Sequence, residues 1–344
     1  MTTLALSSLT RRLRDSVEGE VMDDVFSRGR YATDASIYQI MPRAVVVPRT
    51  PGDVKNVIAL AREEGVPVLP RGGGTSQCGQ TVNDAIVVDS SKHLNGLLKL
   101  DVEARTCVVQ PGMVLDELNR QLKPYGLWYP VDVSTASRAT IGGMAANNSC
   151  GGRSLRYGMM RDNVLAIDAF LADGTEARFA EAGTAGEPGF VADLLELGAR
   201  EQDEIADKFP KVMRRVGGYN IDSLVPNGSP PNLSSLLVGS EGTLAWSDSI
   251  TLKLSPLPVR KAMGVCHFAT FHAAMDAAQH LVKLDPVAVE LVDRTMIELA
   301  RGIDIFRPTI EKVVRGEPDA LLLVDFAEDD WNENLRRLKR MHQV

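Results

Sequence analysis

The segment that decides the fold is "VPVLPRGGGTSQCGQTVN", Val66 to Asn83. Its first residues have the composition of a short buried strand, and three consecutive glycines, Gly72 to Gly74, follow Arg71. Glycine loses more backbone entropy on folding than any other residue, so the interior of a helix or strand disfavours such a run. The run therefore predicts a loop in which the backbone must be free of side chains.

A β-α-β unit leads into this loop. "AVVVP", Ala44 to Pro48, predicts a buried strand, and a helix follows whose N-cap is Thr50, with Pro51 at its first position and Gly65 closing it. "VPVLP" predicts the second strand of the unit. The glycines thus leave the C-terminal end of a strand, where open parallel sheets usually bind ligands.

The composition of the loop favours an anion. Successive backbone N–H groups in glycine-permitted conformations form a concave nest for phosphate. Arg71 adds a charge, and Thr75 and Ser76 add hydroxyl donors, which together suit a dinucleotide pyrophosphate. A tight turn without a ligand is the alternative. The nucleotide triphosphatase loop and the Rossmann motif do not match, because neither a lysine nor a helix start follows the glycines.

The N-terminal and middle parts of the chain alternate between helix and strand patterns. Residues Met1 to about Ser27 predict a helix, and "VADLLELGAREQDEIADKF", Val191 to Phe209, predicts a single amphipathic helix. Asp173-Gly174 predicts the turn of a hairpin. "SSLLVGSEGTLAWSDSITLKLSP" predicts strand with an interruption at Gly239 to Gly242.

A new unit is expected from about Val259. Strand and helix patterns alternate from there in a β-α-β series of the split ferredoxin-like kind. The last helical pattern, "WNENLRRLKRMHQV", reaches Val344 without a cap, so we expect the chain to stop within a helix and the unit to be incomplete.

The bulk composition is that of an ordinary globular protein of two or three units, with 344 residues, 44% hydrophobic and 24% charged. A net charge of -7 argues against nucleic-acid and anionic-membrane surfaces. The four cysteines form no CxxC pair, so no zinc or iron–sulfur site is indicated, and a reducing compartment is favoured. The N-terminus is a poor signal peptide and no run could span a bilayer, which predicts a cytoplasmic protein; a peripheral position at the inner face of the membrane stays open.

Four sequence blocks in order resemble a known family. "PRGGGTS" after a β-α-β unit looks like the pyrophosphate loop of the PCMH-type FAD-binding fold, shared by vanillyl-alcohol oxidase and p-cresol methylhydroxylase. Pro130 to Gly158 and Gly239 to Ala245 resemble its second and third flavin-contacting segments. "AVELVDR", Ala288 to Arg294, resembles the opening of the substrate domain in the D-2-hydroxyacid dehydrogenase branch. That branch includes D-lactate and D-2-hydroxyglutarate dehydrogenases and the flavin subunits of glycolate oxidase.

The resemblance implies an α+β protein with a two-subdomain PCMH-type FAD-binding fold followed by an incomplete ferredoxin-like substrate (cap) domain. We expect residues 1–39 to form an N-terminal helix and linker, residues 40–258 the FAD-binding domain and residues 259–344 the partial cap domain. The two subdomains are expected at about 40–100 and 101–258. The segment from Gly29 to Pro48 looks closest to long bacterial members in which an iron–sulfur module follows the flavin dehydrogenase.

The resemblance also implies a set of FAD-binding residues. They are Arg71, Gly72, Gly73, Gly74, Thr75, Ser76, Asp132, Thr140, Gly142, Gly143, Asn148, Gly151, Glu241, Gly242 and Ile250. Some relatives attach FAD to a histidine near the first loop, but Ser76 and Gln77 occupy that neighbourhood and the nearest histidine is His93, so non-covalent FAD is expected. Cys150 is interpreted as a buried inert thiol, with a flavin tether as the alternative.

The chemistry of the branch needs a base for the hydroxyl proton and a cation for the substrate carboxylate, while the hydride goes to the flavin. The branch's histidine-rich motif, which resembles H-x-G-D-G-N-x-H, is absent, and we assign none of the five histidines a catalytic role and no metal site. Arg153 and Tyr157, with Arg156 beside them, are the candidates for contact with substrate or flavin. Structural pairing of these arginines with acidic residues is the alternative.

Three functional hypotheses follow. The first is the flavin part of an FAD-dependent dehydrogenase that oxidises the CH–OH group of a D-2-hydroxy acid, with an iron–sulfur module or another partner as electron acceptor. The second is an FAD-binding subunit that needs a partner chain or a missing C-terminal region for turnover. The third is a phosphate-binding module without flavin. The sequence leaves the hydroxy acid, the electron acceptor and the oligomeric state open.

Overall fold

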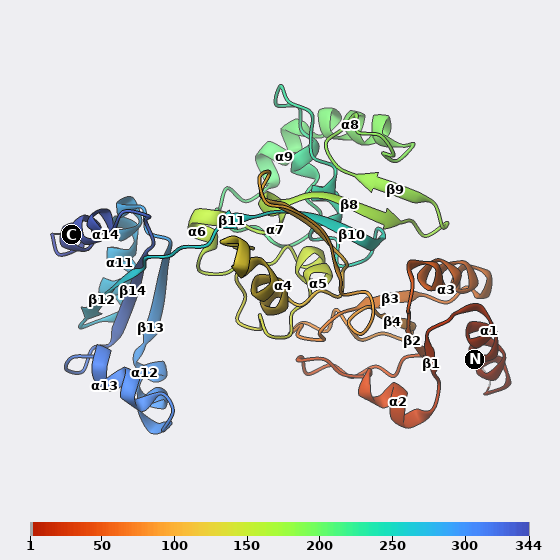
Figure 1. The fold of residues 1–344 in the computed structure, drawn as a ribbon, viewed down its shortest axis with the longest axis horizontal. Helices are drawn as coiled ribbons and strands as arrows, with labels where there is room; N and C mark the ends of the chain where they lie inside the picture. The colour runs from red at the N-terminus through yellow and green to blue at the C-terminus, as the bar shows by residue number, and fades with distance from the viewer. Residues whose placement is uncertain (1–2, 344) are drawn as a thin grey trace. The chain divides into compact units, whose positions relative to one another are not determined.

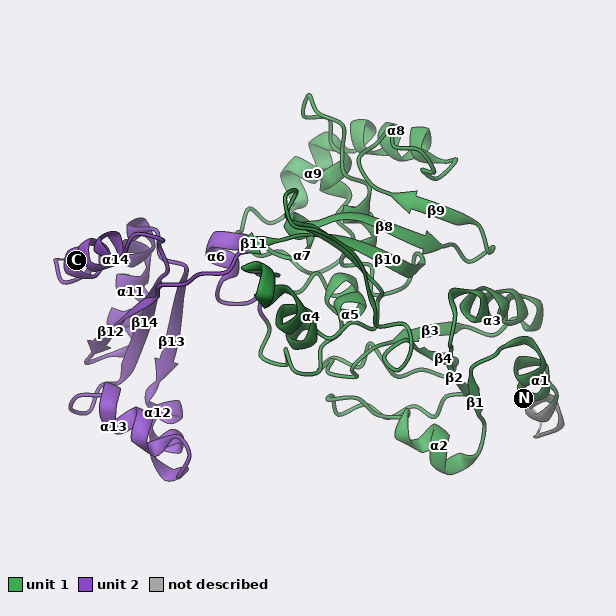
Figure 2. Cartoon of the chain, in the orientation of Figure 1, with its two compact units in different colours: residues 1–129, 133–149, 159–255 green, residues 130–132, 150–158, 256–344 purple. Residues whose placement is uncertain are grey.

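The computed structural model describes residues 3–343, which form an α+β fold. Two compact units are present: unit 1 comprises residues 1–129, 133–149 and 159–255, and unit 2 comprises residues 130–132, 150–158 and 256–344 (Figure 2). The helices are α1 (Thr3–Ser16), α2 (Val25–Arg30), α3 (Pro51–Glu64), α4 (Leu115–Leu122), α5 (Ile141–Ala146), α6 (Ser154–Tyr157), α7 (Met160–Asn163), α8 (Val191–Arg200), α9 (Gln202–Lys208), α10 (Ser234–Leu237), α11 (Phe271–Leu281), α12 (Arg294–Gly302), α13 (Arg307–Val313) and α14 (Trp331–Met341).

The strands are short and belong to several sheets. They are β1 (Glu20–Met22), β2 (Ala44–Val47), β3 (Val68–Arg71), β4 (Ile86–Asp89), β5 (Leu97–Asp101), β6 (Thr106–Val109), β7 (Leu127–Trp128), β8 (Val164–Phe170), β9 (Glu176–Phe179), β10 (Trp246–Lys253), β11 (Ser255–Pro256), β12 (Ala262–Phe268), β13 (Ala288–Asp293) and β14 (Ala320–Phe326). Short 3-10 turns are η1 (Lys123–Tyr125), η2 (Ile221–Leu224) and η3 (Val282–Leu284).

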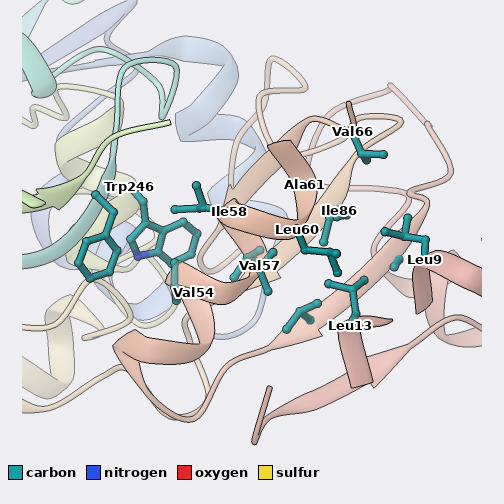
Figure 3. Packing of buried hydrophobic residues seen from close by; sticks show 14 of the residues in the cluster. Leu9, Leu13, Val54, Val57, Ile58, Leu60, Ala61, Val66, Ile86 and Trp246 are labelled. Atoms are coloured by element: carbon teal, nitrogen blue, oxygen red, sulfur yellow. The ribbon is translucent and has the colours of Figure 1, made fainter. Parts of the chain in front are cut away.

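The first sheet has the strand order β1-β2-β4-β3 (Figure 1). Strands β2 and β3 both pair with β4 in parallel, so the strand after the glycine loop lies between the two strands of the predicted β-α-β unit. Helix α3 and helix α1 pack on this sheet around Val46, Ile86, Val57 and Leu13, which are fully buried (Figure 3). This core fixes the strand end from which the glycines leave.

The predicted N-terminal helix to Ser27 is wrong. Helix α1 ends at Ser16, and strand β1 pairs antiparallel with β2 before the short helix α2 begins. Gly19 explains the break, because a Cβ at this position would overlap the carbonyl oxygen of Val47. A helix through Gly19 could not make the close strand contact that follows it.

Helix α3 has the predicted caps. The Thr50 hydroxyl accepts a hydrogen bond from Asp53 N, and the Asp53 carboxylate accepts one from Thr50 N in return, which forms a capping box. Gly65 ends the helix with φ +62°, a left-handed conformation that favours glycine. Asp53 is also buried and accepts hydrogen bonds from Glu18 N (2.8 Å) and Arg49 N (2.7 Å).

The second sheet is antiparallel, with the order β5-β6-β10-β8-β9. The hairpin of β8 and β9 turns at Gly174 with φ +89°, as Asp173-Gly174 predicted. Trp246 and Phe170 of this sheet belong to the same buried cluster as helix α3 of the first sheet, and Figure 3 shows the Trp246 ring beside Ile58 and Val54. The two sheets of unit 1 therefore share one core.

Two predicted elements differ in the structure. The segment from Val191 to Phe209 forms two helices, α8 and α9, because Glu201 leaves the helical conformation between them. "SSLL" forms the short helix α10 rather than the predicted strand. All four of its residues are buried, and a short buried segment shows no periodicity that would distinguish a helix from a strand.

Unit 2 contains a three-stranded antiparallel sheet with the order β12-β14-β13. Strands β12 and β13 are joined through α11 and flank β14, which is the predicted split β-α-β arrangement. Buried Ala274, Leu322 and Val324 lie in its core. Helix α14 ends at Met341, so the prediction that it continues through His342 and Gln343 is wrong, and Val344 lies outside the described residues.

Asp53→Ala should destabilise unit 1 by about 2–4 kcal/mol, because it removes a buried carboxylate that accepts hydrogen bonds from Glu18 N and Arg49 N and that forms one half of the capping box. Thr50→Ala, which removes only the hydroxyl half of the box, should cost about 1 kcal/mol. Urea unfolding followed by circular dichroism measures both. Equal midpoints for the two variants would contradict the assigned role of Asp53.

Candidate functional site

A cavity of about 340 Å³ lies within unit 1, and three separate segments line it. The first is the glycine loop, residues 71–76, with the residues after it as far as Thr81. The second wall is the start of α5 and the residues that follow it, from Thr140 to Asn147. The third wall runs from Ser240 to Ser247. Three sequence blocks that were predicted to share a ligand thus meet at one cavity.

The bare backbone of the glycine loop is needed for contact with the second wall. A Cβ on Gly72 would overlap the Thr140 hydroxyl, and a Cβ on Gly73 would overlap the carbonyl oxygen of Arg138. Gly74 has φ +63°, a conformation that residues with a Cβ rarely adopt. Each of the three glycines is therefore required by a contact or by its conformation.

The N–H groups of the glycine loop are available to a ligand. In the part of the chain that the structure describes, the N–H groups of residues 72–76 donate no hydrogen bond to a protein acceptor. These residues line the cavity, where an anion would meet several donors at once. An unpaired run of N–H groups is uncommon in a folded protein unless water or a ligand occupies it.

Arg71 turns its guanidinium to the protein rather than leaving it free. Its Nη1 donates to the carbonyl oxygens of Tyr31 (3.1 Å) and Thr81 (3.0 Å), and its Nη2 donates to that of Thr33 (2.8 Å). Burial lowers the pKa of Arg71 from its ordinary value, and the nearby Asp89 carboxylate opposes that shift. The predicted contact of its charge with a pyrophosphate stays a prediction.

The second wall is fixed by bonds from its backbone. Thr140 is the N-cap of α5, and its hydroxyl accepts a hydrogen bond from Gly143 N at 3.3 Å. Gly142 N donates to the carbonyl oxygen of Pro111 at 2.8 Å, and a Cβ on Gly142 would lie only 2.7 Å from Pro111 Cβ. Gly142 is therefore required by this packing, and Gly143 lines the cavity beside it.

The third wall is hydrogen-bonded to the second. Gly239 N and Glu241 N donate to the carbonyl oxygens of Ala145 (2.9 Å) and Ala146 (3.0 Å) at the end of α5. Glu241 has φ +54° and Gly242 has φ +75°, so both residues of this turn are in the left-handed region. That conformation is common for glycine but unusual for a residue with a side chain such as Glu241. The Glu241 carboxylate accepts a hydrogen bond from Gln80 Nε2 at 3.4 Å, which connects the third wall to the segment after the glycine loop.

Four of the residues predicted to bind cofactor do not line the cavity. Asn148 is fully buried with φ +50°, and its side chain bonds Arg161 N (3.1 Å) and the Arg215 carbonyl (3.4 Å). Ile250 is fully buried in the middle of β10. The other two, Asp132 and Gly151, belong to unit 2. Asn148 and Ile250 support the cavity walls from behind.

Sequence reasoning also missed residues that line the cavity. Gln80 and Thr81 stand in the quoted opening segment, where a polar residue shortly after a glycine run was a signal that could have been used. Trp246 and Ser247 gave no such signal, because their strand reads as an ordinary core strand. Cys78 lines the cavity and is exposed, whereas Cys150 does not line it.

The catalytic candidates of the sequence belong to unit 2. Arg153 N donates to the Asp132 carboxylate at 3.2 Å. Arg156 donates to the Asp285 carbonyl at 2.6 Å and pairs with Glu328 at 2.7 Å, which supports the structural alternative for this arginine. Burial raises the pKa of Tyr157 above its ordinary value.

The histidine and cysteine chemistry is limited in the described part of the chain. No group of three His, Cys, Asp or Glu side chains could hold a metal ion among the described residues. His267 Nε2 accepts a hydrogen bond from Arg315 N at 3.0 Å, which gives it a structural role. Burial raises the pKa of Cys107 to about 12, so its thiol is inert. Among residues 3–343, no helix is long and apolar enough to cross a membrane.

Comparison with known proteins agrees with this geometry. Residues 42–180 match the family model "FAD binding domain", and residues 257–344 match "FAD linked oxidases, C-terminal domain". Residues 42–180 therefore belong to the FAD-binding domain family, and residues 257–344 to the C-terminal domain family of FAD-linked oxidases. FAD as the cofactor is confirmed by the same matches.

Curated relatives lie in the predicted branch. The chain is 35% identical over 342 residues to the D-2-hydroxyglutarate dehydrogenase of Pantoea ananatis (strain AJ13355), covering 94% of this chain and 33% of that protein. It is 31% identical to "Glycolate oxidase subunit GlcD" of Bacillus subtilis (strain 168), covering 87% of this chain and 56% of that protein. The chain therefore spans about a third to about half the length of such relatives.

The fold is shared with a solved flavoprotein structure. An alkyldihydroxyacetonephosphate synthase superposes with a TM-score of 0.71 at 18% identity, covering all of this chain and 59% of that one. At this identity the likeness shows the fold alone. The predicted α+β FAD-binding fold with two subdomains is confirmed.

Gly73→Ala should cost about 1–3 kcal/mol of folding free energy and weaken FAD binding, because its Cβ would push the glycine loop away from the Arg138 carbonyl. Gly189→Ala is the matched control, since a Cβ there would meet nothing within 4 Å. Urea unfolding and flavin fluorescence quenching measure the two effects. A Gly73→Ala variant that equals the control in both would contradict the contact between the two walls.

A second prediction concerns Asp248, which lies next to the cavity residue Ser247 at the bulge of β10. Burial, helped by the charges of Asp168 and Glu176, raises the pKa of Asp248 to about 6, and Lys55 opposes the shift. The folded state therefore binds this proton more tightly than the unfolded state, so this group lowers stability as pH rises from about 4 to about 6.

Asp248→Asn should accordingly raise the free energy of unfolding at pH 7 by about 1–2 kcal/mol, with solvent screening taken into account. The gain should shrink as pH falls from about 6 to about 4 and disappear below about pH 3, where the wild-type carboxyl is protonated in both states. Chemical denaturation at several pH values measures this. Glu103→Gln, in the exposed turn between β5 and β6, is the control, and a gain independent of pH would refute the assignment.

Proposed function

We propose that this chain is the FAD-binding part of an oxidoreductase that oxidises a D-2-hydroxy acid. The observation that carries the proposal is the run of unpaired N–H groups at residues 72–76, which faces a cavity shared with the second and third walls. Three oriented walls with free backbone donors fit a dinucleotide, whose pyrophosphate needs several donors and whose rings need flat apolar contact. The relatives with dehydrogenase names support the substrate class.

FAD supplies the site that accepts a hydride from the substrate carbon. Within this chain, the glycine loop is proposed to bind the pyrophosphate through residues 72–76. Gly142, Gly143 and Thr140 are proposed to lie along the flavin, and Glu241 and Gly242 to close the cavity from the third wall. Asp132, Asn148, Gly151 and Ile250 are retained as supporting residues of these segments rather than direct ligands.

FAD is proposed to bind without a covalent bond. In the described part of the chain, no histidine lines the cavity, so the residue type that tethers FAD in some relatives is missing there. Cys78 lines the cavity, but a single exposed thiol gives no reason for attachment.

Arg153 and Tyr157 are proposed to act on the substrate side, Arg153 by holding the carboxylate and Tyr157 by hydrogen bonding to the hydroxyl group. The raised pKa of Tyr157 keeps its phenol protonated at neutral pH, so it can donate this hydrogen bond but cannot act as the base. An iron–sulfur module or a partner chain is proposed as electron acceptor.

The alternative is an FAD-binding subunit that has no turnover without a partner chain. The pairing of Arg156 is compatible with it, because this cation already bonds Glu328 and the Asp285 carbonyl and so leaves Arg153 as the arginine proposed for the substrate carboxylate. The two forms differ in one measurable property, which is reduction of bound FAD by substrate.

The purified chain should bind FAD stoichiometrically and release it unchanged on acid precipitation. Anaerobic addition of D-2-hydroxyglutarate, D-lactate or glycolate should bleach the flavin absorption for one acid if the chain is catalytically complete, with L-2-hydroxyglutarate and L-lactate as controls for the two chiral acids. Binding without bleaching supports the subunit alternative. A chain that binds no FAD would refute the proposal, and flavin that stays with the precipitate would refute non-covalent binding.

A further inference from the structure

We infer that the segment from Tyr31 to Tyr38 is a positioning element of the FAD site, which Arg71 and its neighbours fasten to the glycine loop. This inference rests on the proposed FAD binding and adds a role to a part of the chain that precedes residue 42, where the match to the FAD-binding family model begins. It assigns Arg71 as a positioning residue, not as a ligand of the pyrophosphate.

The guanidinium of Arg71 is the first part of this connection. Its three hydrogen bonds reach the carbonyl oxygens of Tyr31 and Thr33 on one side and of Thr81 on the other. It also lies over the Tyr31 ring, 5.2 Å from the centroid. A planar group with fixed donors is suited to joining three carbonyls in this way, and lysine could not reproduce the arrangement. Three of its five N–H donors are thus occupied by carbonyl oxygens of the protein, which is the geometry of a positioning residue.

Backbone and side-chain bonds make the second part. Ala35 N donates to the carbonyl oxygen of Gly74 at 3.2 Å, so the N-terminal segment bonds the glycine run directly. The Thr81 hydroxyl donates to the Asp34 carboxylate at 3.0 Å. The segment thus holds the loop at Gly74, within the run of residues that carry the free N–H groups, and again at Thr81 after that run.

A third contact ties the segment to the sheet. The Tyr31 hydroxyl donates to the Asp89 carboxylate at 2.8 Å, and Asp89 is paired with Arg71 in the register of β4 and β3. Burial raises the pKa of Tyr31, with the Asp89 charge adding to it, so the phenol stays a donor. Gly79 has φ +82°, and a Cβ there would come within 2.6 Å of the Tyr38 ring. The turn at Gly79 therefore packs closely against the segment from Tyr31 to Tyr38.

The physical reason for such an element is preorganisation. A glycine-rich loop has high conformational entropy, and binding would have to order it before its N–H groups could converge on an anion. Bonds from the N-terminal segment at Gly74 and Thr81 hold the loop in place before the ligand arrives. Loss of the bonds made by Tyr31 and Asp34 should weaken FAD binding although neither of these two residues lines the cavity.

The test measures FAD affinity by flavin fluorescence for variants of the full chain. Tyr31→Phe and Asp34→Ala remove bonds from residues that do not line the cavity, and each should raise the Kd for FAD about threefold to tenfold, as expected for the loss of one ordinary hydrogen bond. Arg71→Lys and Arg71→Gln should both raise it by about tenfold or more, to a similar extent. Asp84→Ala is the matched control, because its exposed pair with Arg43 does not involve the loop, and it should leave the Kd unchanged.

Two comparisons distinguish a positioning role from unfolding and from a pure charge effect. Circular dichroism and the urea midpoint of each apoprotein identify a variant that has merely unfolded, and Tyr31→Phe, which keeps the ring, is the variant least exposed to that problem. A Kd for Tyr31→Phe and Asp34→Ala equal to that of Asp84→Ala would overturn the inference. Retained affinity in Arg71→Lys together with loss in Arg71→Gln would also overturn it, since charge rather than geometry would then be what matters. A wild-type chain that binds no FAD would instead refute the proposed function.

Discussion

The site depends on one close approach, that of the glycine loop to the segment before and at the start of α5. Gly72 and Gly73 lie against Thr140 and Arg138 at distances that leave no space for a Cβ. The same absence of side chains leaves the N–H groups of residues 72–76 open to the cavity. Packing between two segments of the protein and binding of an anion therefore make the same demand on the sequence. Substitution of these glycines should harm folding and ligand binding together, and the two effects cannot be separated at these positions.

The positions of the other two walls of the cavity follow from that close approach. Helix α5 is short, and its last carbonyls at Ala145 and Ala146 accept hydrogen bonds from Gly239 N and Glu241 N. The third wall is therefore placed by the second, which in turn is placed against the first. The hydrogen bond from Gln80 to Glu241 connects the third wall to the segment that follows the glycine loop of the first wall. The cavity has a defined shape before any ligand is bound, and this reduces the conformational entropy that binding would otherwise cost.

The sequence predicted the elements that are governed by local chemistry. The caps of α3 at Thr50 and Gly65 and the turn at Gly174 were readable from residue type and order, whereas the meeting of the three glycine-containing blocks was implied by the family resemblance. What could not be read depends on distant contacts. The break at Gly19 reflects the approach of Val47, and Asn148 is held away from the cavity by Arg161 and Arg215. The hydrogen bonds of Arg71 were not predictable for the same reason, since its acceptors are backbone carbonyls that sequence does not reveal.

The second block of the sequence, Pro130 to Gly158, divides between the two units, and this division has a chemical meaning. Its residues 133–149 line or support the cavity in unit 1, whereas residues 130–132 and 150–158 pack within unit 2. There Gly152 allows close contact with Glu290 of β13, and Arg156 pairs with Glu328 after β14. Each has its partner in the part of the chain that matches the C-terminal domain of FAD-linked oxidases. A contiguous stretch of sequence thus contributes to unit 1 and to unit 2, and the contacts of Gly152 and Arg156 lie within unit 2. This division is the reason for proposing Arg153 and Tyr157 for the chemistry of the substrate and the glycines for the binding of the cofactor.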